Sequence, residues 1–468
     1  MVRAPPEGEP GLKRTIGGGQ LLLYGLGSMV GTGIYGLIGK AAGTMGGALW
    51  LAFLVAMSAA LLTGISYASI ASRYPRAGGA AYATQRAYHA PWLSYVVGLT
   101  VLCSGLASIA TQAKVVAENV NVLAGLNFGF TIMSAPAEIL FLGIGFLLIV
   151  AGIVYRGISA SVWVNAAFTV ISGVGLLLVV VVGARFWGQA DLLSAPTTAA
   201  NPLGDITFGL LLQGSILTFF SFLGFEDMLN VAEEVERPER NMPIGIIGAM
   251  LIASLIYIAV SITAVSVVPW RELALAPAPL MLVVDRAAPW FPAIGFTIIT
   301  IAAVSNTALV NFVMGSRLLY GMARQNLVPL AFGRVHGRRR TPQVAIATML
   351  IVVLLMQFAG DISQLASATV LLLLLVFVIV NVALIVLKLR EGNISGRFNA
   401  PMIVPILGAA VCLAMIAGRT INADWRAPAL TCALIAAILL LFFLTGGNRA
   451  RSSSDDLEGT GRPARHDP

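Results

Sequence analysis

One glycine-rich stretch decides the fold: Gly25-Leu26-Gly27-Ser28-Met29-Val30-Gly31-Thr32-Gly33-Ile34-Tyr35-Gly36-Leu37-Ile38-Gly39. It lies inside an apolar segment, residues 21–42, that is long enough to cross a bilayer, since a spanning helix needs roughly 20 residues. Six of its fifteen residues are glycine, although glycine inside a helix costs about 1 kcal/mol relative to alanine. In hydrocarbon, a helix breaks only where protein or a ligand pairs the freed backbone groups. The stretch therefore predicts a membrane helix interrupted at Gly31-Thr32-Gly33, whose second half begins with N–H donors that favour an anion.

The same glycines have a simpler interpretation. Gly27 and Gly31 form a GxxxG pattern, which lets two membrane helices approach closely. Under this alternative the glycines serve helix packing alone and mark no binding site. The rest of the chain is needed to choose between the two.

The composition is that of a polytopic membrane protein. Of the 468 residues, 58% are hydrophobic and only 11% are charged, whereas soluble proteins carry about 25% charged residues. The net charge of +8 lies in short loops between apolar segments, which the positive-inside rule explains without a nucleic-acid partner. We therefore expect a multi-pass protein of the cytoplasmic (plasma) membrane, surrounded by the lipid bilayer.

Apolar stretches of spanning length predict an all-α integral membrane protein with about twelve transmembrane helices. Their expected ranges are 20–41, 46–72, 92–122, 133–155, 160–187, 205–235, 243–268, 291–323, 342–359, 363–389, 401–419 and 427–445. An even number puts both termini on one side, and basic loop residues such as Arg76, Arg237 and Arg338 indicate that this side is cytoplasmic. The expected organisation is a cytoplasmic tail at 1–19, a ten-helix core at 20–400, two further helices at 401–445 and a disordered cytoplasmic tail at 446–468.

A second unusual stretch lies in the expected span 205–235: Phe219-Phe220-Ser221-Phe222-Leu223-Gly224-Phe225-Glu226-Asp227. Each of its two adjacent carboxylates costs about 2.5–3.5 kcal/mol at the centre of a membrane helix. Buried carboxylates of this kind point to a functional site. The alternative is that the span ends earlier and that both carboxylates lie in a cytoplasmic loop, followed by Glu233, Glu234 and Glu236.

The two stretches hold corresponding positions if the first ten helices form two units of five helices each. Units with an odd number of helices are inverted with respect to each other in the membrane. Paired interrupted helices at matching positions of inverted repeats indicate a substrate site near the bilayer midplane. The first break offers N–H groups to an anionic group of the substrate, and the second offers carbonyls to a cationic group. Together the two breaks favour a zwitterionic substrate.

Four motifs in order resemble the amino acid–polyamine–organocation permease superfamily over most of residues 15–400. They are Gly27-Ser28-Met29-Val30-Gly31-Thr32-Gly33-Ile34, Tyr74-Pro75-Arg76-Ala77-Gly78-Gly79-Ala80-Ala81-Tyr82, the second break with the exit loop 232–243, and Gly315-Ser316-Arg317-Leu318-Leu319-Tyr320-Gly321-Met322-Ala323-Arg324. The resemblance implies the ten-helix inverted-repeat fold of the bacterial leucine transporter, with broken helices 1 and 6 and two extra helices.

The resemblance also implies secondary active transport of amino acids by alternating access. A substrate carboxylate would meet the backbone of Ser28, Gly31, Thr32 and Gly33, and a substrate amino group would meet the carbonyls around Phe219, Ser221, Phe222 and Gly224. Glu226 matches a position that is often acidic in the family, where it would accept a proton, pair with the substrate amine or support the break. The alternatives are a permease for an amine such as ethanolamine or a polyamine, and a channel or sensor.

The chain departs from the family pattern in its fifth expected helix. Many members have a lysine there, whose ammonium takes the place of a coupling cation, whereas this chain has Ser172. A sodium ion could replace the missing charge if Ser172 and the segment with Ala302, Ser305 and Asn306 supplied oxygen ligands. Coupling to H+ is the other alternative. These hydroxyls could instead bond to carbonyls of their own helices, as is common in membrane helices.

Enzyme chemistry finds no support in the sequence. The three histidines are scattered, and neither an HExxH nor a nucleophile motif is present. We therefore expect no catalytic residues, no metal site, no cofactor beyond a coupling Na+ or H+, and no obligate protein partner. The expected partner is a small-molecule substrate.

Overall fold

The computed structural model describes residues 12–422, apart from 127, 130, 133–134, 197–203, 277 and 358–362, together with 435 and 438. The expected helix 427–445, apart from those two residues, and the expected tail 446–468 lie outside the described residues, as do residues 1–11 of the expected tail 1–19.

Helices make up almost the whole described structure. In chain order they are α1 (Gly18–Met29), α2 (Thr32–Met45), η1 (Gly46–Ala48), α3 (Leu49–Arg73), α4 (Gly79–Tyr88), α5 (Pro91–Ala124), α6 (Ala137–Arg156), α7 (Ile158–Gly183), η2 (Ala184–Phe186), α8 (Phe208–Phe219), η3 (Phe220–Phe222), η4 (Phe225–Glu234), α9 (Pro238–Val267), α10 (Trp270–Leu275), α11 (Pro279–Ala287), α12 (Ala293–Arg324), η5 (Leu330–Gly333), α13 (Gln343–Met356), α14 (Ser363–Glu391) and α15 (Ile403–Asn422). Two short strands, β1 (Thr131–Ile132) and β2 (Ala135–Pro136), form an antiparallel pair.

Eight helical segments of the described chain are long and apolar enough to cross a membrane. α13 and the first part of α15 are shorter apolar helices. The protein is therefore an all-α, multi-pass membrane protein. The expected segments 20–41 and 205–235 are each broken into shorter helices, because glycine-rich turns interrupt them.

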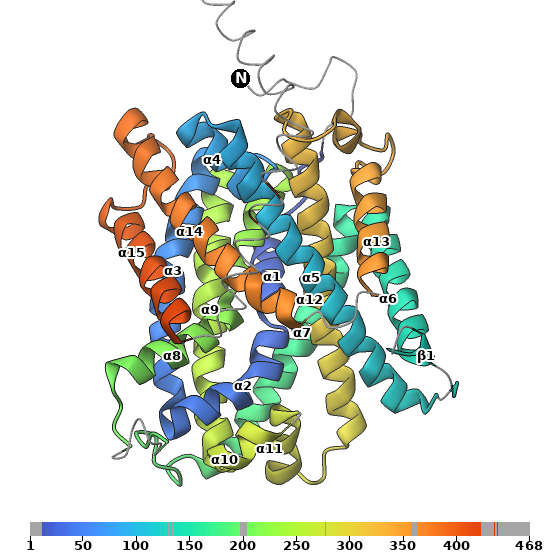
Figure 1. Ribbon diagram of the computed structural model, residues 1–468, viewed down its shortest axis with the longest axis vertical. Coiled ribbons are helices and arrows are strands. Elements are labelled where there is room, and N and C mark those ends of the chain that lie inside the picture. The colour runs from blue at the N-terminus through green and yellow to red at the C-terminus, as the bar shows by residue number, and fades with distance from the viewer. Residues whose placement is uncertain are drawn as a thin grey trace, which may run out of the picture.

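α1 lies in the middle of the bundle, whereas α8 runs from the outer edge of the bundle toward the second break (Figure 1). α1 packs against α9, α7 and α12, while α8 packs against α3 and α2. In Figure 1, α15 lies at one outer edge of the bundle, and α10 and α11 lie at the end opposite the start of α1. Both breaks are therefore surrounded by protein, as unpaired backbone inside a membrane requires.

Three short helices were not expected from the sequence: α4, α10 and α11. Each has between 6 and 10 residues, which is too short to give a spanning apolar stretch. α10 packs against α2, and α4 packs against α5 and α14. They are connections that cover the ends of the longer helices.

The end of the expected tail 1–19 is built into the molecule. The N–H groups of Thr15 and Ile16 both donate to the Glu234 carbonyl, at 2.9 and 3.0 Å, and the Glu236 N–H donates to the Ile16 carbonyl at 2.9 Å. Ile16 and Val235 thus form a parallel bridge, and both side chains are buried. Residues 15–16, before α1, are thus hydrogen-bonded to residues 234 and 236 at the end of η4.

Candidate functional site

The first break is a tight turn at Val30 and Gly31. Val30 has φ −77° and ψ 82°, and the Gly31 N–H donates to the Met29 carbonyl at 2.9 Å. These values are those of an inverse γ-turn. The Tyr257 hydroxyl also donates to the Met29 carbonyl, at 2.8 Å, so the carbonyl end of α1 is paired. The Gly31 N–H is used inside the turn, which leaves the first N–H groups of α2 as the donors facing the break.

The second break is a turn at Leu223 and Gly224 that separates η3 from η4. Leu223 has φ −62° and ψ 141°, and Gly224 has φ 119° and ψ −18°. These dihedrals are close to a type II turn, whose third residue needs a positive φ and is therefore usually glycine. After the turn the chain continues as a 3₁₀ helix of 10 residues. A 3₁₀ run of this length is unusual and often marks a functional hinge.

The two breaks are in direct contact. The Ser28 hydroxyl donates to Asp227 Oδ2 at 2.9 Å, and a Cβ placed on Gly224 would lie 2.4 Å from Ser28 Oγ. A Cβ on Gly33 would lie 2.6 Å from Ser221 Cα. The glycines therefore allow the backbones to approach within van der Waals distance. Of the predicted substrate-binding residues, Ser28, Gly224, Gly33 and Ser221 come together at this junction.

Both carboxylates of the second break are buried, and they lie within the segment Phe208–Glu234, which is long and apolar enough to cross a membrane. Asp227 bonds to Ser28, and Glu226 Oε2 accepts the Gly224 N–H at 2.8 Å. In the described part of the chain, neither carboxylate forms an ion pair. The hydroxyls of Tyr24 and Tyr67 are buried nearby and have no partner. Some buried polar groups near this junction therefore have no hydrogen-bond partner among the described residues.

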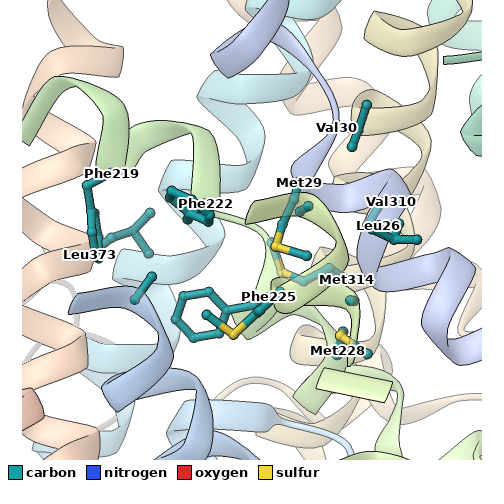
Figure 2. Close-up of a cluster of buried hydrophobic side chains, with 14 of the residues drawn as sticks. Leu26, Met29, Val30, Phe219, Phe222, Phe225, Met228, Val310, Met314 and Leu373 are labelled. Carbon is teal, nitrogen blue, oxygen red and sulfur yellow. The ribbon is translucent and has the colours of Figure 1, made fainter. Parts of the chain in front are cut away.

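Apolar side chains from both breaks form a buried cluster with side chains of other helices (Figure 2). The labelled members of the cluster come from both breaks and from the facing helices α12 and α14: Leu26, Met29, Val30, Phe219, Phe222, Phe225, Met228, Val310, Met314 and Leu373. Phe222 packs edge-on against Tyr257, with ring centroids 5.3 Å apart, and Phe225 packs against Phe377 at 5.3 Å. The predicted aromatic residues are thus part of a packed apolar cluster beside the breaks.

Close packing against α12 explains why residue 31 is a glycine. A Cβ on Gly31 would lie 2.0 Å from Thr307 Oγ1. A side chain at this position would therefore meet α12, which supports the small-residue packing interpretation for this glycine. The predicted residue Thr32 is the first residue of α2, and its side chain is not described.

A second polar network joins α1, α7 and α12. Asn165 Nδ2 donates to Asn306 Oδ1 at 2.9 Å, Asn306 Nδ2 donates to Thr169 Oγ1 at 2.8 Å, and Thr169 donates to the Leu23 carbonyl at 3.2 Å. A Cβ on Gly27 would collide with all three side chains. Asn165 Oδ1 is buried without a partner. The GxxxG glycine thus makes room for a chain of amides and hydroxyls.

The hydrogen bonds of the described residues do not join the expected coupling-ion site into one cluster. The Ser172 hydroxyl donates to the Phe168 carbonyl at 2.7 Å. This is the hydrogen bond within the same helix that was the alternative to an ion site. The Ser172 carbonyl accepts a hydrogen bond from the Tyr35 hydroxyl at 2.8 Å. Asn306 belongs to the amide network above. Ala302 and Ser305 are buried on α12. Among the described residues, no group of three or more His, Cys, Asp or Glu side chains could hold a metal ion.

A buried ion pair closes the end of the molecule at which α1 begins. Arg317 Nε donates to Glu234 Oε2 at 3.0 Å, and both side chains are fully buried. Arg317 lies in the motif of residues 315–324, and Glu234 also binds Thr15 and Ile16 through its carbonyl. On the opposite side, a cavity of about 180 Å³ lies between α2, α5, α11 and α12, lined among others by Tyr35, Asn119 and Phe296.

The sequence missed several of these contacts. Asp227, Thr307, Asn165 and Thr169 touch the breaks or their glycines, but their partners are far away along the chain, as the 199 residues between Ser28 and Asp227 illustrate. The acidic character of Asp227 inside an apolar span was the one available signal.

Two interrupted helices that meet inside an apolar bundle, with buried polar groups at their junction, define a multi-pass membrane transporter for a small molecule. Sequence comparison gives the particular family, because a family described as "Amino acid permease" matches residues 17–446. The chain belongs to this family, and it is an amino acid transporter and not an enzyme. The expected membership of the amino acid–polyamine–organocation superfamily is confirmed.

The chain is similar to several permeases and transporters. The branched-chain amino acid permease BcaP of Bacillus subtilis (strain 168) is 28% identical over 443 residues, which cover 90% of each chain. The methylthioribose transporter of the same organism is 28% identical over 428 residues, covering 86% of this chain and 87% of the relative. Cationic amino acid transporter 4 of Mus musculus is 29% identical over 401 residues, covering 82% of this chain and 61% of the relative.

Proposed function

We propose that this permease moves a zwitterionic amino acid with an apolar side chain across the plasma membrane by alternating access. The observation that carries the proposal is the direct contact of the two broken helices through Ser28 and Asp227. Inverted-repeat transporters bind their substrate where two such helices meet. The first N–H groups of α2 then face the substrate carboxylate, and the carbonyls around Phe219, Ser221 and Phe222 face its amino group.

The apolar cluster beside the breaks favours an aliphatic substrate side chain. Met29, Phe222, Phe225 and Met314 belong to this cluster (Figure 2), and a binding site lined by such residues gains affinity from apolar surface removed from water. The similarity to a branched-chain amino acid permease agrees with this preference. Leucine, isoleucine and valine are therefore the first substrates to test.

A cationic or carboxylate-free amine is the second candidate. The buried carboxylates Glu226 and Asp227 have no cationic partner in the described part of the chain, and the cationic amino acid transporters are relatives. However, both carboxylates already accept hydrogen bonds inside the second break. An ethanolamine or polyamine substrate would also leave the donors of α2 unused.

Matched ligands distinguish the two candidates. We expect leucine to raise the melting temperature of the purified protein, because a ligand that binds only the folded state stabilises it. 3-Methylbutylamine, which is leucine without its carboxylate, should have no effect at the same concentration. Stabilisation by 3-methylbutylamine or ethanolamine but not by leucine would show that the site binds an amine and not a zwitterion.

For the coupling ion, we propose H+ with Glu226 as its acceptor. Two adjacent buried carboxylates without a cation are costly when both carry a charge, and one bound proton removes that cost. The competing proposal is Na+ at Ser172, Ala302, Ser305 and Asn306. The polar atoms of Ser172 and Asn306 are already engaged in hydrogen bonds, which favours the proton.

The substitution Glu226→Gln tests the proton proposal. The amide oxygen still accepts the Gly224 N–H, so the break is kept, but the side chain no longer takes up a proton. In liposomes, an inward gradient of one pH unit supplies about 1.4 kcal/mol, enough for about tenfold accumulation. We expect wild-type uptake to respond to this gradient and the variant to retain exchange without the response.

The control for this experiment is Glu236→Gln, which changes an exposed carboxylate just beyond η4. Its uptake should follow the pH gradient as the wild type does. Uptake that depends on external sodium and ignores the pH gradient would instead support the sodium site.

For the topology, we propose twelve spans, of which the first ten form two inverted units of five helices, with both termini in the cytoplasm. The support is the positive-inside rule. The arginines at 73, 76, 237, 240 and 338–340 lie at the ends of helices or between helices, and Arg237 directly follows the segment 234–236 that pairs with residues 15–16.

A further inference from the structure

A cavity far from the helix breaks lies between the end of α14 and the start of α15. Its volume is about 520 Å³, and its lining includes Lys388, Asn393, Asn399 and Met402. The lining contains no aspartate or glutamate. The end of α14 and the start of α15, whose residues line the cavity, lie at the outer edge of the bundle, toward the end of the molecule where α1 begins (Figure 1). The cavity is therefore separate from the proposed substrate site.

Among the described residues, no carboxylate forms an ion pair with Lys388. Its ammonium donates to the Ala400 carbonyl. The two neighbouring carboxylates have other partners: Glu391 pairs with Arg86 at 2.9 Å, and Glu239 pairs with Arg397 at 3.5 Å. An ammonium has three N–H donors, so Lys388 retains donors for a ligand.

A second cation lies behind the cavity wall. Arg73 is only 5% exposed, and its Nη2 donates to Asn399 Oδ1 at 2.7 Å. Its Nε and Nη1 have no hydrogen-bond partner, and no carboxylate pairs with it in the described structure. Arg73 is close enough to Lys388 to repel it electrostatically. Glu391 is near enough to act on Arg73 electrostatically, but its ion pair is with Arg86. Two neighbouring cations that form no ion pair within the described residues make this cavity positive.

The cavity wall is rigid. The Asn399 side chain donates to the carbonyls of Ile394 and Arg397, both at 2.9 Å. The loop is also fixed to α3, because the Phe398 N–H donates to Ser72 Oγ at 2.9 Å. The N-terminus of the 20-residue helix α15 begins directly after the lining residue Met402 and adds the positive end of its dipole. The site is therefore preorganised for an anion.

An apolar surface continues from the cavity along α15. Ile403 is 57% exposed, and Ile406 and Leu407 are also exposed. Positions 403, 406 and 407 are spaced at i, i+3 and i+4 and so share one helix face. An exposed apolar face of this kind suits the acyl chains of a lipid. A ligand that combines a phosphate with acyl chains would satisfy the cavity and the adjoining face together.

We propose that this cavity binds the phosphate group of an anionic phospholipid, with Lys388 as the direct ligand and Arg73 supplying charge from behind. Basic pockets between membrane helices at the cytoplasmic side are known to suit anionic headgroups. A soluble phosphate would meet the same cations but not the apolar face of α15.

The experiment measures the melting temperature of the purified protein in neutral phosphatidylcholine with increasing phosphatidylglycerol. We expect phosphatidylglycerol to raise the melting temperature of the wild type at low ionic strength. For Lys388→Gln we expect an affinity at least about fivefold weaker, since one Lys near a charged membrane surface contributes about 1 kcal/mol. Lys388→Arg keeps the charge and should retain most of the effect.

Two controls make the result decisive. Lys13→Gln removes an exposed lysine that lies before the start of α1, so it should respond to phosphatidylglycerol as the wild type does. Inorganic phosphate should leave the melting temperature unchanged. If it raised the melting temperature as much as phosphatidylglycerol does, the ligand would be a soluble phosphate and not a lipid. Equal phosphatidylglycerol affinities of the wild type and Lys388→Gln would overturn the proposal. So would a variant that is destabilised to the same extent with and without the anionic lipid, because Lys388 would then only cap α14.

Discussion

Gly31 is the residue at which the two interpretations of the glycine-rich stretch can be separated. A Cβ at this position would lie 2.0 Å from Thr307 Oγ1 and 3.2 Å from Thr307 Cβ. We expect Gly31→Ala to lower the free energy of unfolding by about 1–3 kcal/mol, as overpacking does, and Gly31→Val to abolish uptake. Adding Thr307→Ala to Gly31→Ala removes the nearest atom and should restore most of the stability and the uptake.

The measurements are thermal unfolding of the purified variants and leucine uptake into liposomes. Gly145→Ala is the matched control, because a Cβ there meets nothing within 4 Å. If the double variant recovers its stability but still does not transport, the methyl group at position 31 obstructs the substrate itself. That outcome would assign Gly31 to carboxylate binding as well as to packing.

At the scale of helices, the sequence predicts the breaks well because glycine and carboxylates are anomalous inside apolar spans. The first break lies at residues 30–31, one residue before the predicted 31–33, of which 32 and 33 already belong to α2, and the second lies at 223–224, inside the predicted stretch 219–227. The partners of these breaks could not be predicted, because Thr307 and Tyr257 come from α12 and α9. Periodicity within one segment carries no information about which distant helix packs against it.

The contact between η4 and α12 rests on the buried pair of Arg317 and Glu234. Both side chains are fully buried, so removing one partner leaves an uncompensated charge. We expect Arg317→Met to lower the free energy of unfolding by about 3–5 kcal/mol. The double variant Arg317→Met, Glu234→Leu should regain a large part of that loss, because no buried charge remains. Thermal unfolding of the single and double variants measures both effects.

The exposed pair of Arg86 and Glu391 is the control for this cycle. The side chain of Arg86 is 48% exposed, and exposed pairs contribute about 0–1 kcal/mol. Arg86→Met should therefore change stability far less than Arg317→Met. A double variant at 317 and 234 that is no more stable than Arg317→Met alone would mean that the loss comes from packing and not from the unpaired carboxylate.

At the scale of the whole molecule, alternating access requires one end to close while the other opens. The described structure is closed at the end where α1 begins, through the bridge between Ile16 and Val235 and the Arg317–Glu234 pair. The cavity beside Tyr35 lies toward the other end. Because the segments before α1 and after η4 continue directly into the two broken helices, movement of these helices must separate the bridge.

A reversible cross-link tests this movement. Residues paired in a parallel bridge lie at about the Cα separation that a disulfide accepts, so Ile16→Cys with Val235→Cys should form a disulfide on oxidation. In a background with Cys103, Cys412 and Cys432 replaced by alanine, we expect oxidation to stop leucine uptake and a reductant to restore it. Ile16→Cys alone should transport under both conditions. Undiminished uptake by the fully cross-linked protein would show that this end stays closed throughout transport, which alternating access forbids.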